Sequence, residues 1–356
     1  MTLIIAEAGV NHNGSDELAF KLVDAAHEAG ADIVKFQTFK AKNLVTESAK
    51  QADYQVANTG QQESQFSMLK RLELSYETHH KLVKYCQELG IEFLSTAFDS
   101  ESLDFLVNDL GITRLKLPSG EITNAPLVLE HARTGCDLIV STGMATLSDI
   151  DYVLSVIAFG YLHPEGDPTD ELLLEAYYSE EGKALLKEKV TLLHCTTEYP
   201  APYDDINLNA MDTMKDAFKL SVGYSDHSEG IVVPISAVAK GAVLIEKHFT
   251  TDKSLPGPDH KASLDPVELK AMVEGIRIAE RVLGDGIKGP RPLEVKNKEV
   301  ARKSLIVAQA LKAGEVITKS HVVVKRPGDG MPPSLYWKVL NTEASQDYQV
   351  GQLLDE

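Results

Sequence analysis

The first 285 residues alternate short apolar runs with longer helix-like stretches, and this alternation constrains the fold most. Each run is rich in β-branched residues and apolar on both faces, as expected of strands that are covered on two sides. Parallel strands joined by helical crossovers have this pattern. The runs span residues 3–6, 32–36, 92–95, 114–117, 137–141, 190–195, 220–224 and 242–246. We therefore predict an α/β fold in which residues 1–285 form a (β/α)8 barrel.

Two insertions and a C-terminal extension depart from a minimal barrel. Residues 40–75 form a long polar insertion after the second run, where long ordered loops are usually functional. Residues 161–189 are acidic, and we expect them to be a solvated surface excursion without a direct role. Gly, Pro and basic residues at 286–300 predict a linker. Short apolar runs with Gly-containing turns at 301–356 predict a small β-rich domain.

Composition and charge exclude several classes of protein. The net charge of −18 argues against binding to nucleic acid or to an anionic membrane, because both need a basic surface. Glu7 interrupts the first apolar stretch, so we expect no signal peptide, and no apolar run is long enough to span a bilayer. Cys86, Cys136 and Cys195 lack metal-type spacing and predict free thiols. We expect a cytoplasmic protein.

Polar side chains stand at or just past the end of nearly every predicted strand. The C-terminal ends of barrel strands carry the reacting groups in enzymes of this fold, whereas barrel interiors are normally filled by branched apolar residues. A functional pocket therefore explains these residues better than packing does. They are Glu7, Lys35, Gln37, Thr96, Lys116, Ser119, Glu121, Ser141, Thr142, Thr196, Thr197, Tyr199, Ser225, Asp226, His227, Lys247 and His248.

His227 and His248 follow or end the last two predicted strands. Neighbouring strands bring their ends together, so the two imidazoles can bind one cation and leave other positions open to substrate. Asp226 is placed to orient one ring. The alternative is that each is an ordinary hydrogen-bonded histidine.

Lys35 and Lys116 place two ammonium groups at the predicted barrel mouth, where burial without compensation is costly. An anionic ligand with a phosphate and a carboxylate would compensate them, with Thr96, Ser119 and Ser225 as hydroxyl donors. The alternative is a set of salt bridges to Glu7 and Glu121. These two carboxylates are also candidates for proton transfer or for holding a water molecule.

Ten segments in order carry a resemblance to a known family. They are "IAEAGVNHNG" (5–14), "VKFQTF" (34–39), "FLSTAFD" (93–99), "LKLPSGE" (115–121), "STGMAT" (141–146), "LHCTTEYPAP" (193–202), "GYSDHS" (223–228), "IEKHFT" (245–250), "PGPDH" (256–260) and "VKRPGDG" (324–330). The whole chain resembles the N-acetylneuraminate (sialic acid) synthase family.

The resemblance implies a (β/α)8 TIM barrel followed by a small domain similar to type III antifreeze proteins, a SAF or β-clip domain. It implies a transferase that condenses phosphoenolpyruvate with N-acetylmannosamine to give N-acetylneuraminate and phosphate. A divalent metal is implied, Mn²⁺ in the first place, with Mg²⁺ or Co²⁺ as alternatives. Legionaminic acid synthases, which use 2,4-diacetamido-2,4,6-trideoxymannose, share nearly all these segments and are the alternative reading.

Roles follow from the resemblance by motif matching. His227 and His248 would hold the metal. Phosphoenolpyruvate would be bound by Lys35, Thr96, Lys116, Ser119 and Ser225. The sugar would be contacted by Gln37, Asn58, Tyr199 and Asp259. Glu7 and Glu121 would be the acid and base, and with Lys35 and Lys116 they form the expected catalytic set. Arg326 would reach the sugar bound in the partner's barrel of a homodimer.

One position departs from the family's pattern, and two other functions are alternatives to the synthase. Thr197 stands where some members of that family have Asn, so the resemblance implies that a donor to phosphoenolpyruvate is either changed or lost. Another metal-dependent aldolase or isomerase on the same barrel would not explain the small domain. A non-catalytic sugar-binding or ice-binding module would not explain the His, Lys and Glu residues at the strand ends.

Overall fold

The computed structural model describes residues 1–60 and 62–355. The chain divides into two compact units, Met1–Gly284 and Asp285–Glu356, and each is considered by itself. Within the described residues, none of the helices combines the length and the apolar composition that a bilayer crossing requires.

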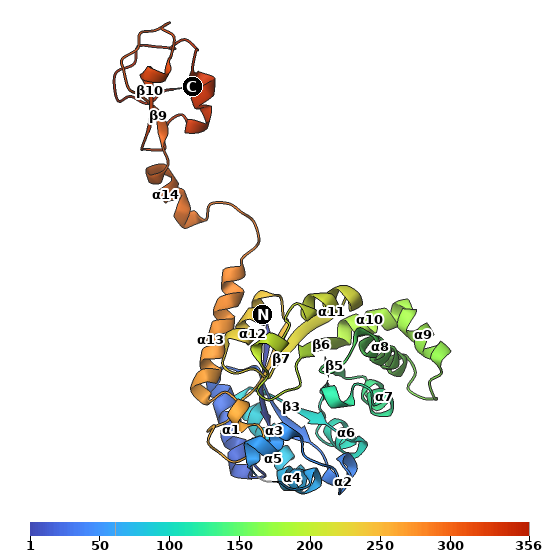
Figure 1. Ribbon diagram of the computed structural model, residues 1–356. Helices are drawn as coiled ribbons and strands as arrows, with labels where there is room; N and C mark the ends of the chain where they lie inside the picture. Colours follow the sequence, from blue (N-terminus) through green and yellow to red (C-terminus); the bar gives the residue numbers. More distant parts are fainter. Residues whose placement is uncertain (61, 356) are drawn as a thin grey trace. The chain divides into compact units, whose positions relative to one another are not determined.

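The first unit is a closed barrel of parallel strands, each hydrogen-bonded to the next, with β8 closing on β1 (Figure 1). Within residues 1–60 and 62–284 the barrel strands are β1 (Leu3–Gly9), β2 (Ile33–Thr38), β3 (Glu92–Ala97), β4 (Arg114–Leu117), β5 (Asp137–Ser141), β6 (Val190–Cys195), β7 (Ser221–Asp226) and β8 (Leu244–His248). Every predicted run overlaps one of them, so the barrel prediction is confirmed. Several strands extend two or three residues beyond the predicted end, because polar residues continue the ladder.

Helices surround the barrel (Figure 1) and bury their apolar faces against it. The α-helices of this unit are α1 (Asp16–Ala29), α2 (Ala41–Leu44), α3 (Asp53–Thr59), α4 (Gln65–Leu72), α5 (Tyr76–Leu89), α6 (Ser100–Asp104), α7 (Ala125–Arg133), α8 (Leu147–Leu162), α9 (Asp170–Tyr178), α10 (Glu180–Lys189), α11 (Ala210–Phe218), α12 (Val232–Ala239) and α13 (Pro266–Leu283). Short 3-10 or π turns are η1 (Phe105–Asp109), η2 (Ser119–Glu121), η3 (Tyr203–Asp205) and η4 (His260–Ala262). The predicted caps of α1 are present: the Ser15 hydroxyl accepts from the Leu18 amide, and Gly30 ends the helix in the left-handed region.

Alternate residues of the strands point into the barrel and form stacked layers. One layer is apolar and consists of Ile5, Ile33, Leu94, Ile139, Leu193 and Leu244. Two residues further along the strands, toward their C-terminal ends, the same face carries Glu7, Lys35, Thr96, Ser141 and Glu246. The apolar layer therefore closes the barrel beneath a polar one, which is open to a pocket.

Both insertions are largely helical. Residues 40–75 contain α2, α3 and α4, and residues 161–189 contain α9 and α10. The acidic insertion also contributes Leu173, Ala176 and Leu186 to the core between the barrel and its helices. It is thus packed on one side and solvated on the other.

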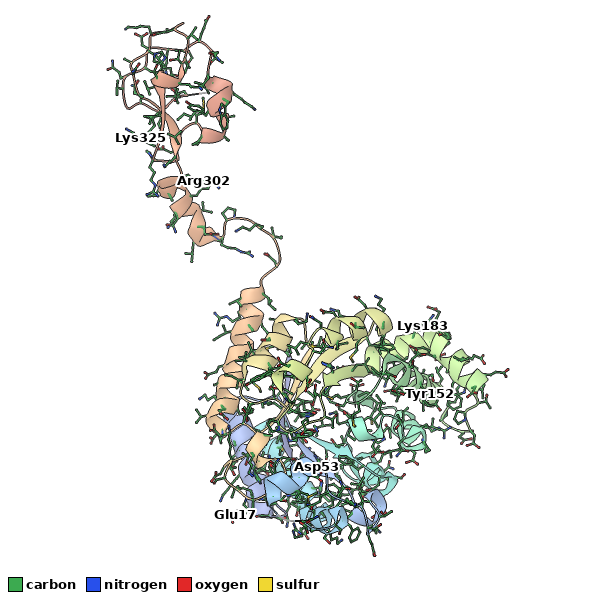
Figure 2. The ribbon with its side chains drawn as sticks, in the orientation of Figure 1. Glu17, Asp53, Tyr152, Lys183, Arg302 and Lys325 are labelled. Carbon is green, nitrogen blue, oxygen red and sulfur yellow. The ribbon has the colours of Figure 1, made fainter. Side chains whose placement is uncertain are left out.

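The second unit contains α14 (Pro292–Ala301), β9 (Ser304–Val307), η5 (Lys319–His321), β10 (Val322–Lys325), η6 (Pro333–Leu335) and α15 (Tyr336–Val339). Strands β9 and β10 pair antiparallel over a small core that includes Leu305 and Tyr348. Arg302 and Lys325, just after α14 and at the end of β10, are exposed (Figure 2). The predicted linker at 286–300 contains most of α14, because Pro292 begins a helix whose Glu294 accepts from the Arg291 amide.

Candidate active site

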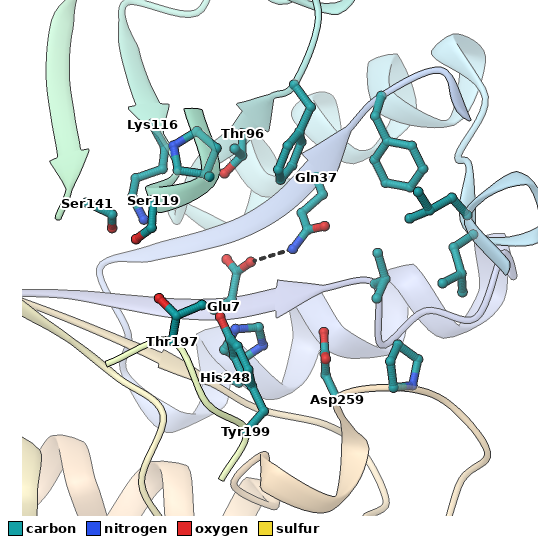
Figure 3. Close-up of a pocket in the computed structure, with 18 of the residues that line it drawn as sticks. Glu7, Gln37, Thr96, Lys116, Ser119, Ser141, Thr197, Tyr199, His248 and Asp259 are labelled. Carbon is teal, nitrogen blue, oxygen red and sulfur yellow. Dashed lines mark hydrogen bonds between the residues drawn. The ribbon is translucent and has the colours of Figure 1, made fainter. Parts of the chain in front are cut away.

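Most of the predicted site residues line one cavity of about 320 Å³ at the C-terminal end of the barrel (Figure 3). Of the predicted set, the lining residues are Glu7, Lys35, Gln37, Thr96, Lys116, Ser119, Glu121, Tyr199, Ser225, His227, His248 and Asp259. Asn58 and Arg326 are not among them. The floor of the cavity is the polar layer of the barrel, so the fold itself delivers these groups to one place.

A buried cluster of charges forms the floor. The Lys35 ammonium lies 2.7 Å from a Glu7 carboxylate oxygen and 3.4 Å from Glu246. The Lys116 ammonium donates to both Glu246 oxygens at 2.8 and 3.1 Å. Two hydroxyls complete the cluster: Thr96 Oγ1 accepts from Lys35 at 3.1 Å, and Ser225 Oγ donates to Glu246 at 2.8 Å.

The cluster pairs two lysines with two carboxylates of different acidity. Burial raises the pKa of Glu7 to about 7, although the neighbouring Lys35 opposes the rise. The pKa of Glu246 is lowered, because Lys116 and Lys35 outweigh the effect of burial. Likewise, burial acts to lower the pKa of Lys35, but Glu246 and Glu7 raise it overall. The pKa of Lys116 is lowered by burial, although Glu246 opposes the fall. Two buried lysines thus share one carboxylate whose pKa is lowered and one whose pKa is raised, and an anionic ligand would favour the charged form of both lysines.

Glu246 is the site residue that sequence reasoning missed. It ends the predicted eighth run, where it counts as a strand residue and not as a site residue. The signal was available, because the alternation of strand residues places Glu246 on the same face as His248 and opposite to Lys247. In the structure it contacts both lysines and Ser225.

Glu121 lines the same cavity as the two lysines but forms no ion pair with them within the described residues, and its expected role in proton transfer stays a prediction. It lies in η2 at the cavity wall, half-buried, where it accepts a hydrogen bond of 2.7 Å from the Asn124 side chain. Within the described chain, the ion pairs of Lys35 and Lys116 are made with Glu7 and Glu246 instead.

The two histidines converge as predicted. Their ring centroids are 5.7 Å apart, and each side chain is buried. The Tyr199 ring lies 4.1 Å from that of His227 and 5.6 Å from that of His248, and so encloses the pair. Burial lowers the pKa of His227 to about 4 and that of His248 well below its ordinary value. Both rings are therefore neutral, which is the form that binds metals.

The hydrogen bonds of the two rings fit a divalent metal with open positions. His227 Nδ1 donates to the Thr196 carbonyl at 2.6 Å, so its Nε2 carries a lone pair. His248 Nδ1 is buried and has no hydrogen-bond partner in the described chain. No group of three or more His, Cys, Asp or Glu residues arranged to hold a metal is found among residues 1–60 and 62–355. A metal here would take two imidazoles from the chain and its remaining ligands from substrate or water.

Asp226 does not orient a histidine ring, which corrects the sequence-based expectation. Its carboxylate pairs with Lys247 at 2.6 Å and accepts from the Ser228 amide and hydroxyl. Both members of the ion pair are fully buried. They point to the helix side of the barrel wall, because alternation places them opposite to Ser225 and His248. The backbone carbonyl of Thr196 takes the expected role of Asp226.

Ser119 and Thr197 lie next to each other around Gly143. The Gly143 amide donates to Ser119 Oγ at 3.0 Å. A Cβ atom at this glycine would lie 2.3 Å from Thr197 Oγ1 and 2.7 Å from Ser119 Oγ, so no side chain fits here. Thr197 therefore places a hydroxyl beside Ser119 at the cavity wall.

The residues expected to contact the sugar are only partly together. Gln37 and Asp259 lie in the cavity (Figure 3), and burial raises the pKa of Asp259 to about 6. Asn58 is not a lining residue: its amide donates to the Pro258 carbonyl at 2.7 Å and so braces the loop that carries Asp259. Arg326 belongs to the second unit, where it is exposed and its Nε donates to the Ala301 carbonyl at 3.1 Å.

The chain is similar to known proteins over most of its length. Residues 22–288 match the model of the NeuB family. The chain is 45% identical over 355 residues to an N,N'-diacetyllegionaminic acid synthase of Campylobacter jejuni, covering 100% of this chain and 99% of that protein. It is 46% identical over 351 residues to the enzyme of the same name from Legionella pneumophila, covering 99% and 92%. The crystal structure of N-acetylneuraminic acid (sialic acid) synthetase from Leptospira borgpetersenii is similar with a TM-score of 0.67 and 31% identity, covering 83% of this chain and 90% of that one. The chain therefore belongs to the NeuB family and is an enzyme.

Proposed function

We propose that this enzyme condenses phosphoenolpyruvate with 2,4-diacetamido-2,4,6-trideoxymannose to give N,N'-diacetyllegionaminic acid and phosphate. One observation supports this type of reaction: a cluster with two lysines and a pair of neutral imidazoles line the same cavity. The identities of 45% and 46% to two synthases of that name, against 31% to a sialic acid synthetase, support this sugar over N-acetylmannosamine. N-acetylmannosamine, the first substrate that the resemblance implies, is therefore the alternative.

The lysine cluster would bind phosphoenolpyruvate. Its phosphate and carboxylate carry the negative charge that Lys35 and Lys116 need when Glu7 is protonated. The hydroxyls of Thr96, Ser119 and Ser225 surround the two ammonium groups as further donors. The Thr197 hydroxyl, beside Ser119, would be a further donor to the anion.

His227 and His248 would hold a divalent cation, Mn²⁺ in the first place, with Mg²⁺ or Co²⁺ as alternatives. When bound, such a cation polarises the sugar aldehyde and stabilises the negative charge that develops on its oxygen. Tyr199 covers both rings and shields this end of the cavity from water.

Glu7 is suited to move the protons. Carbon three of phosphoenolpyruvate attacks the aldehyde carbon, a carbon–carbon bond forms, and the sugar oxygen takes a proton from the Glu7 carboxylic acid. Water then adds at carbon two and returns one proton to Glu7. The carbon–oxygen bond to phosphate breaks as the new hydroxyl becomes the carbon-two ketone, and the proton of that hydroxyl leaves with the phosphate. A pKa of about 7 lets Glu7 serve in both directions at neutral pH. Glu246, with its lowered pKa, stays ionised and fixes Lys116 and Ser225.

We also propose that the second unit is an antifreeze-like domain and that the enzyme works as a homodimer. Arg326 would then reach the sugar bound in the barrel of the second copy. Support comes from the "VKRPGDG" segment and from the exposure of Arg326.

The experiment that tests the function is a continuous phosphate-release assay with phosphoenolpyruvate and each of the two sugars, with the product mass measured. We expect turnover with the diacetamido sugar to exceed that with N-acetylmannosamine, to stop after chelation, and to return with Mn²⁺. A higher kcat/KM for N-acetylmannosamine would overturn the sugar assignment. Full activity after chelation would overturn the metal assignment.

A further inference from the structure

The cavity has a second, chemically different half. Figure 3 shows side chains without nitrogen or oxygen gathered beyond Gln37 and Asp259, away from Lys116 and Ser119. The apolar lining residues that come from residues 39–72, here called the apolar wall, are Phe39, Leu44, Val45, Met68, Leu69 and Leu72; the same stretch also lines the cavity with two polar side chains, Gln55 and Gln65. Most residues of the apolar wall belong to a hydrophobic cluster separate from the main core.

The apolar wall comes from the insertion after β2 and not from the barrel. Apart from Phe39, its residues lie in or next to α2 and α4. The Glu73 carboxylate accepts from the Ala41 amide at 2.8 Å and ties the two helices together. The bond from Asn58 to the Pro258 carbonyl ties the same insertion to the loop of Asp259. The wall is therefore a built surface with a fixed position beside the sugar-facing groups.

A sugar whose aldehyde carbon lies near His227 and His248 would pass Gln37 and Asp259 before its far carbons meet this wall. The two candidate sugars differ at those far carbons. The diacetamido sugar has a methyl group at carbon six and an acetamido methyl at carbon four, whereas N-acetylmannosamine has hydroxyls at both positions. Methyl groups gain from contact with hydrocarbon, and a hydroxyl buried there loses its bonds to water.

We infer that the apolar wall is the specificity element of this enzyme and selects sugars that carry methyl groups at the end far from the aldehyde. The inference rests on the proposed function, because it assigns a surface to part of the proposed substrate. One methyl-sized difference in a hydrophobic pocket changes kcat/KM by roughly 10- to 200-fold, and an added hydroxyl is rejected by roughly 100-fold.

Three sugars and two variants test the inference. The sugars are the diacetamido sugar, 2-acetamido-2,6-dideoxymannose and N-acetylmannosamine, so that carbon six is tested apart from carbon four. Leu69→Gln adds a polar group to the half-buried wall position in α4, and Val45→Thr adds a hydroxyl with almost no change of shape. The control is Leu174→Gln, the same exchange at a position of α9 that is 53% exposed and outside the cavity.

We expect the unmodified enzyme to prefer 2-acetamido-2,6-dideoxymannose to N-acetylmannosamine by roughly 10-fold or more. Leu69→Gln should reduce this ratio by at least about 10-fold, with kcat/KM for N-acetylmannosamine kept or raised. Val45→Thr should act in the same direction, and Leu174→Gln should leave the ratio unchanged. If both wall variants lower kcat/KM equally for all three sugars, or do not change it, the wall is not a specificity element, even though the proposed function stands. If the unmodified enzyme prefers N-acetylmannosamine to the diacetamido sugar, the proposed function is wrong, and the inference that rests on it is wrong as well. Melting curves identify a variant that does not fold, in which case the other wall variant decides.

Discussion

Replacing Glu246 by Gln should strongly destabilise the ligand-free enzyme. The same replacement should increase the stabilisation that a bound anion gives. Glu246 is buried and contacts Lys116 at 2.8 Å and Lys35 at 3.4 Å. Gln keeps the shape but removes the charge that both ammonium groups face. Removal of one partner from a buried ion pair costs about 3–5 kcal/mol, because the other charge stays buried. For a unit of this size we expect the melting temperature to fall by roughly 2–4 °C for each kcal/mol.

The assay is thermal unfolding of metal-free protein with and without phosphoenolpyruvate. A ligand at 100 times its Kd stabilises by about 2.7 kcal/mol, so the ligand-induced shift reports affinity. We expect the shift to be larger for Glu246→Gln than for the unmodified enzyme, since the anion supplies the missing negative charge. Glu77→Gln, which breaks the exposed pair with Lys81, is the control and should leave the melting temperature unchanged. An unaltered melting temperature of Glu246→Gln, or a smaller shift with phosphoenolpyruvate, would refute the role of Glu246 as the charge partner.

Three further predictions concern the metal, the pH and the second unit. His227→Ala and His248→Ala should lose phosphate release and Mn²⁺ binding. The loss of activity and of Mn²⁺ affinity should exceed the roughly 10- to 100-fold that is typical of residues which only support a metal ligand, and circular dichroism should show an intact fold. The pKa of Asp259, raised to about 6, gives stability that is full below pH 3.8 and is lost as the pH rises through 6. Asp259→Asn should therefore match the unmodified enzyme near pH 4 and exceed its stability by up to about 3 kcal/mol above pH 6; equal denaturant midpoints at pH 8 would contradict this. Arg326→Ala and Lys116→Gln chains should each be inactive, and their equal mixture should recover activity if the sites are shared between subunits; no recovery would count against the homodimer.

The sequence predicts the barrel almost completely. Its eight strands are short, apolar on both faces and separated by well-capped helices, so local preference and tertiary structure agree. Strand ends were predicted too early because polar residues lower the apparent strand tendency. Glu7 and His248 nevertheless lie within β1 and β8, since barrel hydrogen bonds continue through them.

The site was predicted in outline, and the errors have one physical origin. Glu7, Lys35, Lys116, His227 and His248 were found because each is a charged or metal-binding type at a strand end. Which of these side chains contact one another depends on the strand face that each occupies and on the residue at which each strand ends. The spacing of residues along the sequence does not show either of these.

Two further residues differ from the contacts that the sequence predicts. Glu121 follows β4 by only a few residues and lies in η2, where it accepts a hydrogen bond from Asn124 and, within the described chain, forms no ion pair with the lysines. Asn58 lies in an insertion whose fold no periodic pattern describes, and it braces a loop instead of lining the cavity.

The order of charges on β8 has a consequence for how the barrel closes. Glu246 and His248 face the interior, while Lys247 between them faces the opposite side and meets Asp226. A displacement of β8 by one residue against its neighbours would exchange these faces. Lys247 would then join Lys35 and Lys116 in a repulsive group of three cations, and Glu246 would approach Asp226. Glu246, Lys35 and Lys116, which are expected to bind the substrate, thus also disfavour closure of the barrel with β8 in the wrong register. A mutation that neutralises one of them should therefore slow folding as well as catalysis.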